Sequence, residues 1–251
     1  MIMRRDYKGI SINTSKNTHE TVFELLDKTK DRVIGDIPCG SGAFVLRLKD
    51  HGFTRVKAID IENILEIDHN DFVQADMTKT WSMENESLDA LVCIDGIEHI
   101  SQQFEFVREA NRVLKNQGEF IVSTPNISSL KSRWKWFTTG HHHKCSSPLD
   151  ENHPTPLHHI GMISYPEIRY QLHTSGFSIV EVTTNRIKPV NLLYGILVPF
   201  FYLMSLSVYW RVGRKEGTWN QNKEILRTMF SSKILFGETM IVKAIKKRSI
   251  S

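Results

Sequence analysis

The segment that decides the fold reads Arg32-Val-Ile-Gly-Asp-Ile-Pro-Cys-Gly-Ser-Gly42. Its first half is a short apolar run, which predicts a buried strand over 32–37. Its second half is a glycine-rich turn, and a helical pattern of apolar residues follows over 43–51. A turn of this kind lets a ligand approach the backbone closely and directs free N–H groups toward it.

The same alternation of strands and helices extends outward from this segment. We expect strands at Arg32–Ile37, Arg55–Asp60, Phe72–Asp76, Leu88–Ile94, Glu119–Thr124, Phe177–Thr183 and Glu238–Lys246. We expect helices at Asn17–Lys30, Ala43–His51, Ser101–Lys115 and from Ser164 to Gly176, with capping-box spacing at Asn17/Glu20 and Ser164/Glu167. Strands that alternate with helices form parallel sheets. The sequence therefore predicts an α/β fold, a Rossmann-like seven-stranded and mostly parallel sheet with helices on both faces.

Two acidic residues follow the glycine turn at the ends of later strands. Asp60 lies about 20 residues after Gly40, a spacing that suits a carboxylate bound to ribose hydroxyls. Asp76 ends the third predicted strand, where it is placed to accept from an adenine amino group. Both residues have an alternative role as caps of the strand ends. The turn lacks the third glycine of Gly-x-Gly-x-x-Gly, which disfavours a nucleotide-dependent dehydrogenase.

The fourth predicted strand ends in Cys93-Ile-Asp-Gly-Ile-Glu-His99, at the edge where open α/β sheets bind ligands. With this segment the chain resembles the class I S-adenosylmethionine (SAM)-dependent methyltransferases, in particular the ubiquinone or polyprenyl type and those of surface-glycan clusters. The resemblance covers residues 17–184 and the last strand. It rests on Asp36…Gly40-x-Gly42, Asp60, Phe72-Val-Gln-Ala-Asp76, Asp89-Ala-Leu-Val, Glu98-His99 and Arg112-Val-Leu-Lys-x-x-Gly118.

This resemblance implies that SAM is the cofactor. It assigns the methionine part to the glycine turn, the ribose to Asp60 and the adenine to Asp76. The chain departs from the family pattern at Pro38, which stands where the first glycine usually lies and lacks a backbone donor. Asp36 is expected mainly to order the loop. The cofactor-binding residues that the resemblance implies are Asp36, Gly40, Gly42, Asp60, Asp76, Met77 and Asp95.

Two insertions interrupt what we expect to be a single methyltransferase domain over 1–251. Residues 125–163 form a lid insertion and residues 185–233 an apolar and basic insertion, because both exceed the length of ordinary connections. Together they are expected to cap the acceptor. The rest of the domain is a cofactor-binding core at 17–124 and C-terminal sheet elements at 164–184 and 238–247.

Histidine is the expected catalytic residue type, because transfer to an oxygen is helped by a general base. His99 directly follows the fourth strand and is the predicted base; the alternative is a histidine that caps the next helix or hydrogen-bonds the loop. Clustered histidines and Cys145 suit zinc, but no pair of histidines in the lid insertion has tight ligand spacing with an acidic second shell. We expect a polar loop, an acceptor contact or a base there, and no metal. The histidines of this insertion are His141, His142, His143, His153, His158 and His159.

Composition excludes disordered, collagen-like and coiled-coil chains, since 40% of the 251 residues are hydrophobic and 24% are charged. The three cysteines show no pairing spacing and indicate a reducing compartment. The first residues show no apolar core of a signal peptide. We therefore expect a cytoplasmic protein.

Positive charge is concentrated at the end of the chain. The basic tail, from Arg211 onward, has ten Lys and Arg against three Asp and Glu, while the whole chain has a net charge of +4. Such a tail suits an anionic partner, either lipid or nucleic acid, or serves only as a solvated face. No base-flipping motif or RNA-binding module is recognisable, so no nucleic-acid partner is expected.

Leu192–Trp210 contains no charged residue and approaches the length of a membrane span. If the last strand pairs with Phe177–Thr183, both ends of this stretch lie on one side of a bilayer, and a single span is excluded. A broken hairpin in one leaflet, or a cap buried against the domain or a second subunit, remains; a true span stays open only if the last strand is misread. Leu130–Phe137 is basic and aromatic, either a helix at a membrane or glycan or one packed on the domain.

The predicted function is methyl transfer from SAM to a hydroxyl of a lipid-linked, polyprenyl or sugar acceptor. Residues 192–210 and the basic tail are expected to contact the inner face of a membrane, and a homodimer stays open. The rivals are a catalytically inactive methyltransferase fold that binds SAM or a partner, and a nucleic-acid methyltransferase. Turnover of SAM to S-adenosylhomocysteine separates catalysis from binding.

Overall fold

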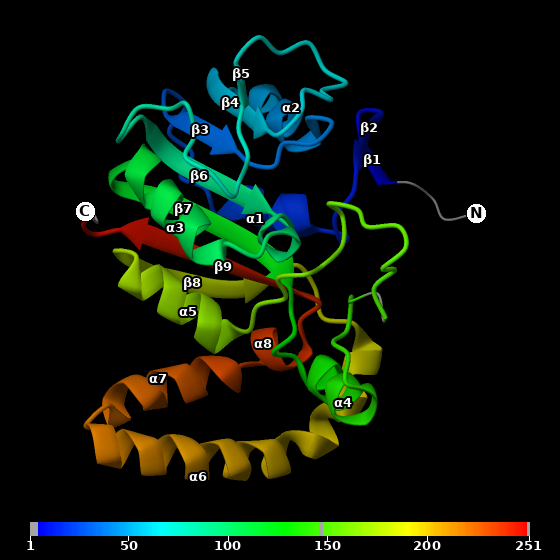
Figure 1. Cartoon of the computed structure of the whole chain (residues 1–251), viewed down its shortest axis with the longest axis vertical. Helices are drawn as coiled ribbons and strands as arrows, with labels where there is room; N and C mark the ends of the chain where they lie inside the picture. Colours follow the sequence, from blue (N-terminus) through cyan, green and yellow to red (C-terminus); the bar gives the residue numbers. More distant parts are fainter. Residues whose placement is uncertain (1–4, 146–147, 250–251) are drawn as a thin grey trace.

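Seven strands pair into one mixed sheet in the computed structural model, which describes residues 5–145 and 148–249 (Figure 1). Across the sheet the order is β5-β4-β3-β6-β7-β9-β8, and β9 runs antiparallel to both of its neighbours while the other pairs are parallel. This confirms the predicted Rossmann-like fold. The strands are β3 (Val33–Asp36), β4 (Arg55–Asp60), β5 (Phe72–Gln74), β6 (Leu88–Ile94), β7 (Leu114–Pro125), β8 (Phe177–Thr184) and β9 (Thr239–Lys246).

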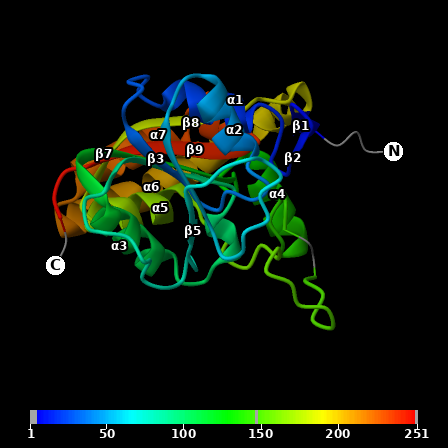
Figure 2. The same cartoon turned by 90° about the horizontal axis from the view of Figure 1, so that it is seen from above.

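Helices cover both faces of this sheet. Helices α1 and α2 lie on one face, and α3 and α5 lie on the other (Figure 2). The helices are α1 (Thr18–Leu25), α2 (Ala43–Asp50), α3 (Gln103–Val113), α4 (Leu130–Thr139), α5 (Tyr165–Thr174), α6 (Val198–Glu216), α7 (Trp219–Met229) and α8 (Ser232–Phe236), with 3₁₀ segments η1 (Ile97–His99) and η2 (Pro189–Leu197).

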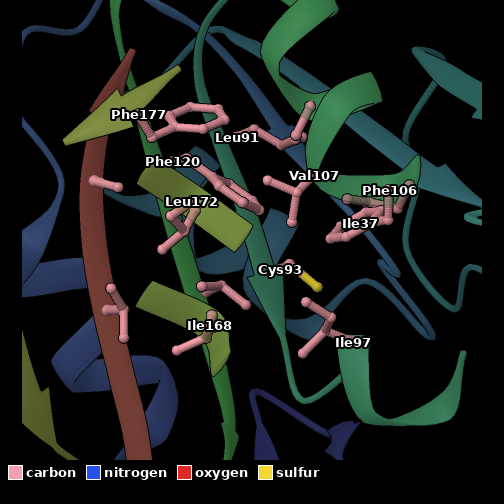
Figure 3. Packing of buried hydrophobic residues seen from close by; sticks show 14 of the residues in the cluster. Ile37, Leu91, Cys93, Ile97, Phe106, Val107, Phe120, Ile168, Leu172 and Phe177 are labelled. Atoms are coloured by element: carbon pink, nitrogen blue, oxygen red, sulfur yellow. The ribbon is translucent and has the colours of Figure 1, made fainter. Parts of the chain in front are cut away.

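Successive side chains of the central strands point to opposite faces of the sheet, so the core consists of two clusters, one on each face. Along β6, Leu91 and Cys93 join the cluster under α3 and α5, whereas Val92 joins the cluster under α1 and α2. Figure 3 shows the first cluster, in which the Phe120 ring lies 6.0 Å from that of Phe106 and 5.4 Å from that of Phe177. Both faces of the strands are therefore buried, as their continuous apolar runs predict.

Helix ends differ from the predicted ones where local polar groups compete with the helix. Helix α1 ends at Leu25 rather than Lys30, because the Asp27 carboxylate accepts from the N–H and hydroxyl of Thr29 and forms a turn. The predicted capping box at Asn17 is wrong, since Asn17 is left-handed and its side chain makes no cap. The box at Ser164 and Glu167 is confirmed at the start of α5.

An N-terminal hairpin precedes the sheet and was not expected from the sequence. Its strands are β1 (Arg5–Tyr7) and β2 (Ile10–Ile12), which form a separate antiparallel pair. Strand β5 is shorter than predicted and ends at Gln74. Asp76 therefore lies beyond the strand rather than at its end.

The second insertion forms an arm, defined here as η2, α6 and α7 (Pro189–Met229), that lies as a separate layer below the sheet in Figure 1. Helix α6 packs against α7, and η2 packs against α4. Among the described residues, one helical stretch, Pro189–Glu216, is long and apolar enough to cross a membrane, and its most apolar part is exposed to solvent. Of the alternatives for Leu192–Trp210, a cap buried against the chain's own domain is therefore contradicted.

Glu238, at the start of β9, connects both insertions to the sheet. Its buried carboxylate pairs with Arg186, with Lys188 at 2.8 Å and with Lys144 of the lid insertion at 3.3 Å. Burial alone raises the pKa of this carboxyl, but hydrogen bonds from Arg186 and Lys188 outweigh it and hold the pKa at about 2.

Replacing Glu238→Gln should lower stability by about 1–3 kcal/mol at pH 7, because three cations lose their shared partner. For a chain of this size the melting temperature falls by about 2–4 °C per kcal/mol. The folded pKa lies below the ordinary value of 4.5, so the contribution is complete above that pH and is lost as the pH falls toward 2. Thermal melts should thus show a variant deficit at pH 7 that narrows at pH 3. The control is Glu181→Gln, whose pair with Lys233 is exposed; an equal deficit in both variants would contradict the anchoring role.

Candidate functional site

A cavity of about 660 Å³ lies at the carboxyl ends of β3, β4 and β6. The first hairpin and the end of the lid insertion complete its walls. This position follows from parallel pairing, because the loops after parallel strands gather at one edge of the sheet. The lining residues are Ser11, Ile12, Asn13, Thr14, His19, Asp36, Pro38, Cys39, Gly40, Ser41, Ala43, Phe44, Asp60, Ile61, Glu62, Ile64, Ile94, Asp95, His99, Leu157 and His159.

The two glycines of the turn have different roles. Gly40 lines the cavity with φ +52°, and a Cβ at this position would point into open space. Gly42 lies at the start of α2 with φ +91° and does not line the cavity; a Cβ there would come within 2.9 Å of Leu65 and Ile67. Gly40 thus leaves its backbone open to a ligand, whereas Gly42 allows close packing behind the turn.

Two carboxylates stand beside this turn. Asp60, at the end of β4, accepts the Gly40 N–H at 2.8 Å and that of Ile61 at 2.8 Å, which fixes the loop and orients the carboxylate. Asp36, at the end of β3, is 2% exposed, and burial followed by the charge of Asp60 raises its pKa well above the usual range. A cationic ligand group in the cavity would offset this unfavourable burial of like charges.

Asp95 holds the hairpin over the cavity. This residue follows β6 with φ +47°, and its carboxylate accepts from the hydroxyls of Thr14 and Ser123. Thr14 and its neighbours become part of the cavity wall through this contact. Asp95 therefore shapes the site as well as lining it.

Asp76 and Met77 lie outside the cavity lining. The Asp76 carboxylate accepts from the Thr78 N–H at 2.9 Å and the Thr78 hydroxyl at 2.7 Å, and it pairs with Lys79. The backbone bond from Thr78 is the main reason why the Asp76 pKa is lowered. Met77 packs against the core under α3. In this structure Asp76 orders a turn, and its adenine contact stays a prediction.

Pro38 is accommodated by a glycine on the neighbouring loop. The Ile37–Pro38 peptide bond is cis. A Cβ at Gly96 would lie 2.3 Å from Pro38 Cδ and 3.1 Å from Cys93 Sγ. Pro38 itself lines the cavity. The loops after β3 and β6 are therefore matched to each other at this departure from the family pattern.

His99 faces the cavity beside His159 of the lid insertion. The two rings lie 4.8 Å apart, edge to face. His99 Nδ1 is 3.3 Å from the carbonyl oxygen of His158. Burial lowers the pKa of His99, and the neighbouring His159 lowers it further. His99 is thus neutral at pH 7, the form that accepts a proton.

The sequence analysis missed Thr14, His19 and Leu157, and it named His159 only as one of six lid histidines. Thr14 reaches the cavity from the segment after β2 and His19 from α1, and Leu157 and His159 reach it from the lid insertion. Burial lowers the pKa of His19 to about 3. The short β-branched Ile10-Ser-Ile12 segment was a signal for the hairpin. Nothing in the spacing identified His159 among its neighbours.

Comparisons with known proteins agree with this geometry. Residues 35–122 match the family model of the methyltransferase domain. No match was found among curated proteins.

Solved structures of SAM-dependent methyltransferases share the fold. One from Archaeoglobus fulgidus has 17% identity and a TM-score of 0.56, over 91% of this chain and 92% of that one. One from Mesorhizobium loti has 14% identity and a TM-score of 0.54, over 90% and 96%. The methyltransferase-domain match over residues 35–122, together with this shared fold, supports a class I SAM-dependent methyltransferase with S-adenosylmethionine as its cofactor.

Proposed function

We propose that this methyltransferase acts on a hydroxyl of a lipid-linked acceptor, polyprenyl or sugar in nature, at the inner face of a membrane. The observation that carries the proposal is the exposed apolar surface of the arm. A soluble monomer rarely exposes a large contiguous apolar patch without a partner for it.

The cavity residues fit the cofactor. Its volume lies within the ~300–1,000 Å³ typical of small-molecule sites. Asp60 keeps lone pairs for ribose hydroxyls while it fixes Gly40, and the buried Asp36 carboxylate suits the cationic methionine part. When bound, SAM supplies an activated methyl group, so the protein mainly positions the acceptor. His99 is the proposed catalytic residue, since its neutral imidazole faces the same cavity.

The apolar face is formed by the exposed hydrophobic residues of the arm. Ile196 is 85% exposed and Leu193 75%, values that are costly in water and favourable in lipid. Trp136 and Phe137 of α4 are also exposed, and α4 packs against η2, so they extend this face toward the lid insertion. The residues of the apolar face are Val190, Leu192, Leu193, Ile196, Phe200, Tyr202, Leu203, Met204, Val208, Trp210 and Val212.

The topology is compatible with a surface position and not with a single crossing. Strands β8 and β9 are neighbours in one sheet, so the segment between them returns to the side that it left. Helix α7 is rich in polar residues and is unsuited to a second crossing. The proposed position of the arm is therefore along one leaflet.

Only part of the basic tail serves this surface. Arg211, Arg214 and Lys215 lie on or near the end of α6 and are exposed. Lys243 pairs instead with Glu119 at 2.6 Å, and Lys246 is buried and pairs with Glu86. The prediction that the whole tail contacts a membrane is corrected to its first residues.

Replacing Asp60→Asn should weaken SAM binding by about 1–3 kcal/mol, or roughly 5- to 150-fold, because a charged acceptor for the ribose is lost. Isothermal titration calorimetry measures this. Asp71→Asn, an exposed carboxylate paired with Lys57, is the matched control and should bind SAM normally. Equal affinity in both variants would remove Asp60 from the cofactor site.

Replacing His99→Ala should lower turnover by about 10²–10⁴-fold with little change in SAM affinity. The assay follows S-adenosylhomocysteine formed with membrane lipid extract as the acceptor. Nucleic acid replaces the lipid in a parallel reaction. Turnover with nucleic acid alone would contradict the lipid acceptor, and SAM binding without turnover on any acceptor would favour the inactive binding protein.

The intact protein should co-sediment with anionic vesicles, and high salt should release only part of it. Basic residues contribute about 1 kcal/mol each and are screened, whereas apolar insertion is not. The double variant Ile196→Glu, Leu203→Glu should reduce the salt-resistant fraction about tenfold or more. Val180→Glu changes an apolar residue outside the arm that is also exposed, at 55%, and is the control.

Two results would contradict the membrane position. The first is an intact soluble protein that ignores anionic vesicles. The second is a dimer in light scattering that the double variant dissociates, which would assign the apolar face to a second copy of the chain.

A further inference from the structure

Glu98 is a buried carboxylate whose oxygens make no contact that explains its burial. It is fully buried, and neither oxygen has a hydrogen-bond partner of ordinary geometry among residues 5–145 and 148–249. The Thr124 hydroxyl lies near and favours the charged form, but burial and the charge of Asp95 raise the Glu98 pKa well above its usual range. Burial of a carboxylate without a partner is unfavourable, so a missing cationic partner is indicated.

Two neutral imidazoles face the same point. Glu98, His99 and His159 each bring one ligand atom, and these atoms lie within 4.8 Å of one another. His99 Nδ1 faces the His158 carbonyl, which leaves Nε2 available, and His159 Nδ1 is buried without a partner in the described chain. A backbone carbonyl on the second ring nitrogen is the usual support of a metal-binding histidine.

The backbone holds the lid insertion against this cluster. The Gly161 N–H donates to the Glu98 carbonyl at 2.8 Å, and the Gln103 side chain binds the Gly161 carbonyl. A Cβ at Gly161 would lie 2.1 Å from the Ile100 carbonyl oxygen, so this docking requires glycine. His159, two residues earlier, is thereby fixed beside His99.

We propose that Glu98, His99 and His159 bind one divalent transition-metal ion of the zinc type, with an open coordination position toward the cavity. Two imidazoles and one carboxylate form a set typical of catalytic zinc, which keeps one position for a water or substrate. Ligand atoms about 2.1 Å from one ion lie roughly 3–4 Å apart, so small side-chain rotations close the set. This replaces the expectation that no metal binds.

The ion gives the site a way to activate a hydroxyl, and this part of the inference rests on the proposed function. The acceptor oxygen takes the open position and loses its proton to solvent, because a bound cation lowers the pKa of an oxygen ligand. One lone pair of that oxygen forms the new O–CH₃ bond as the S–CH₃ bond of SAM breaks, which leaves S-adenosylhomocysteine. His99 then acts on the hydroxyl through the ion rather than by taking the proton itself.

Titration of the chelator-treated full chain with Zn²⁺, by calorimetry, tests the site directly. One tight site is expected, and Co²⁺ in its place should give visible absorption bands. Glu98→Gln and His159→Ala should each lower the Zn²⁺ affinity about 100-fold or more. Loss of a residue that only hydrogen-bonds a metal ligand typically lowers the affinity by about 10–100-fold. His153→Ala is the matched control, since His153 is exposed in the same insertion and pairs with Asp150. Equal metal affinity in all three variants, with normal circular dichroism, would overturn the site.

Different experimental outcomes contradict the metal site and the proposed function. Turnover on the lipid acceptor should vanish in chelator and return with added metal, while SAM affinity stays unchanged. Full turnover in chelator overturns the metal role and leaves the methyl transfer to a lipid hydroxyl standing. Metal binding that depends on Glu98 supports the site even where the lipid acceptor proves wrong.

Discussion

Parallel pairing of β3 with β4 and β6 is the constraint on which the site depends. It brings the ends of three strands to one edge, and the side chains that follow them include Asp36, Asp60, Asp95 and Glu98. Carboxylates placed so close together in a buried region repel one another and lose hydration. The structure compensates with backbone N–H groups at Asp60 and hydroxyls at Asp95. Among the described residues, the Glu98 oxygens have no hydrogen-bond partner of ordinary geometry, and burial together with the charge of Asp60 raises the pKa of Asp36.

These two carboxylates have different neighbours and different proposed roles. Asp36 lines the cavity at the glycine turn, where we propose that the cationic part of SAM binds. Glu98 lies beside His99 and His159, where we propose a metal ion. The methyl donor and the group that activates the acceptor would then meet across one cavity. Burial makes each interaction stronger than it would be in water.

The antiparallel strand β9 has the second organising role. Because it lies between β7 and β8, the long insertion before it must return to the same sheet that it left. Glu238 fixes that return with cations from both insertions. Lys144 of the lid insertion and Arg186 and Lys188 before the arm thus bind the same carboxylate next to β9. The lid insertion and the arm are therefore held at the same end of this strand.

The sequence by itself determined the sheet, the glycine turn and the methyltransferase family, because these depend on patterns between residues close in the chain. Gly40 and Asp60 line the cavity, since the ends of neighbouring parallel strands lie at one edge of the sheet; their contacts with the cofactor stay predictions. Two local predictions fail. Asn17 adopts a left-handed conformation and does not cap α1, and Asp76 accepts the Thr78 N–H in a turn instead of ending strand β5. Only the tertiary structure selected His159 from six neighbouring histidines and placed it beside Glu98, since Gly161 docks the insertion onto the loop after β6. Likewise, only the fold exposed the arm: an apolar stretch predicts burial, and whether protein or lipid provides it depends on what the rest of the chain covers.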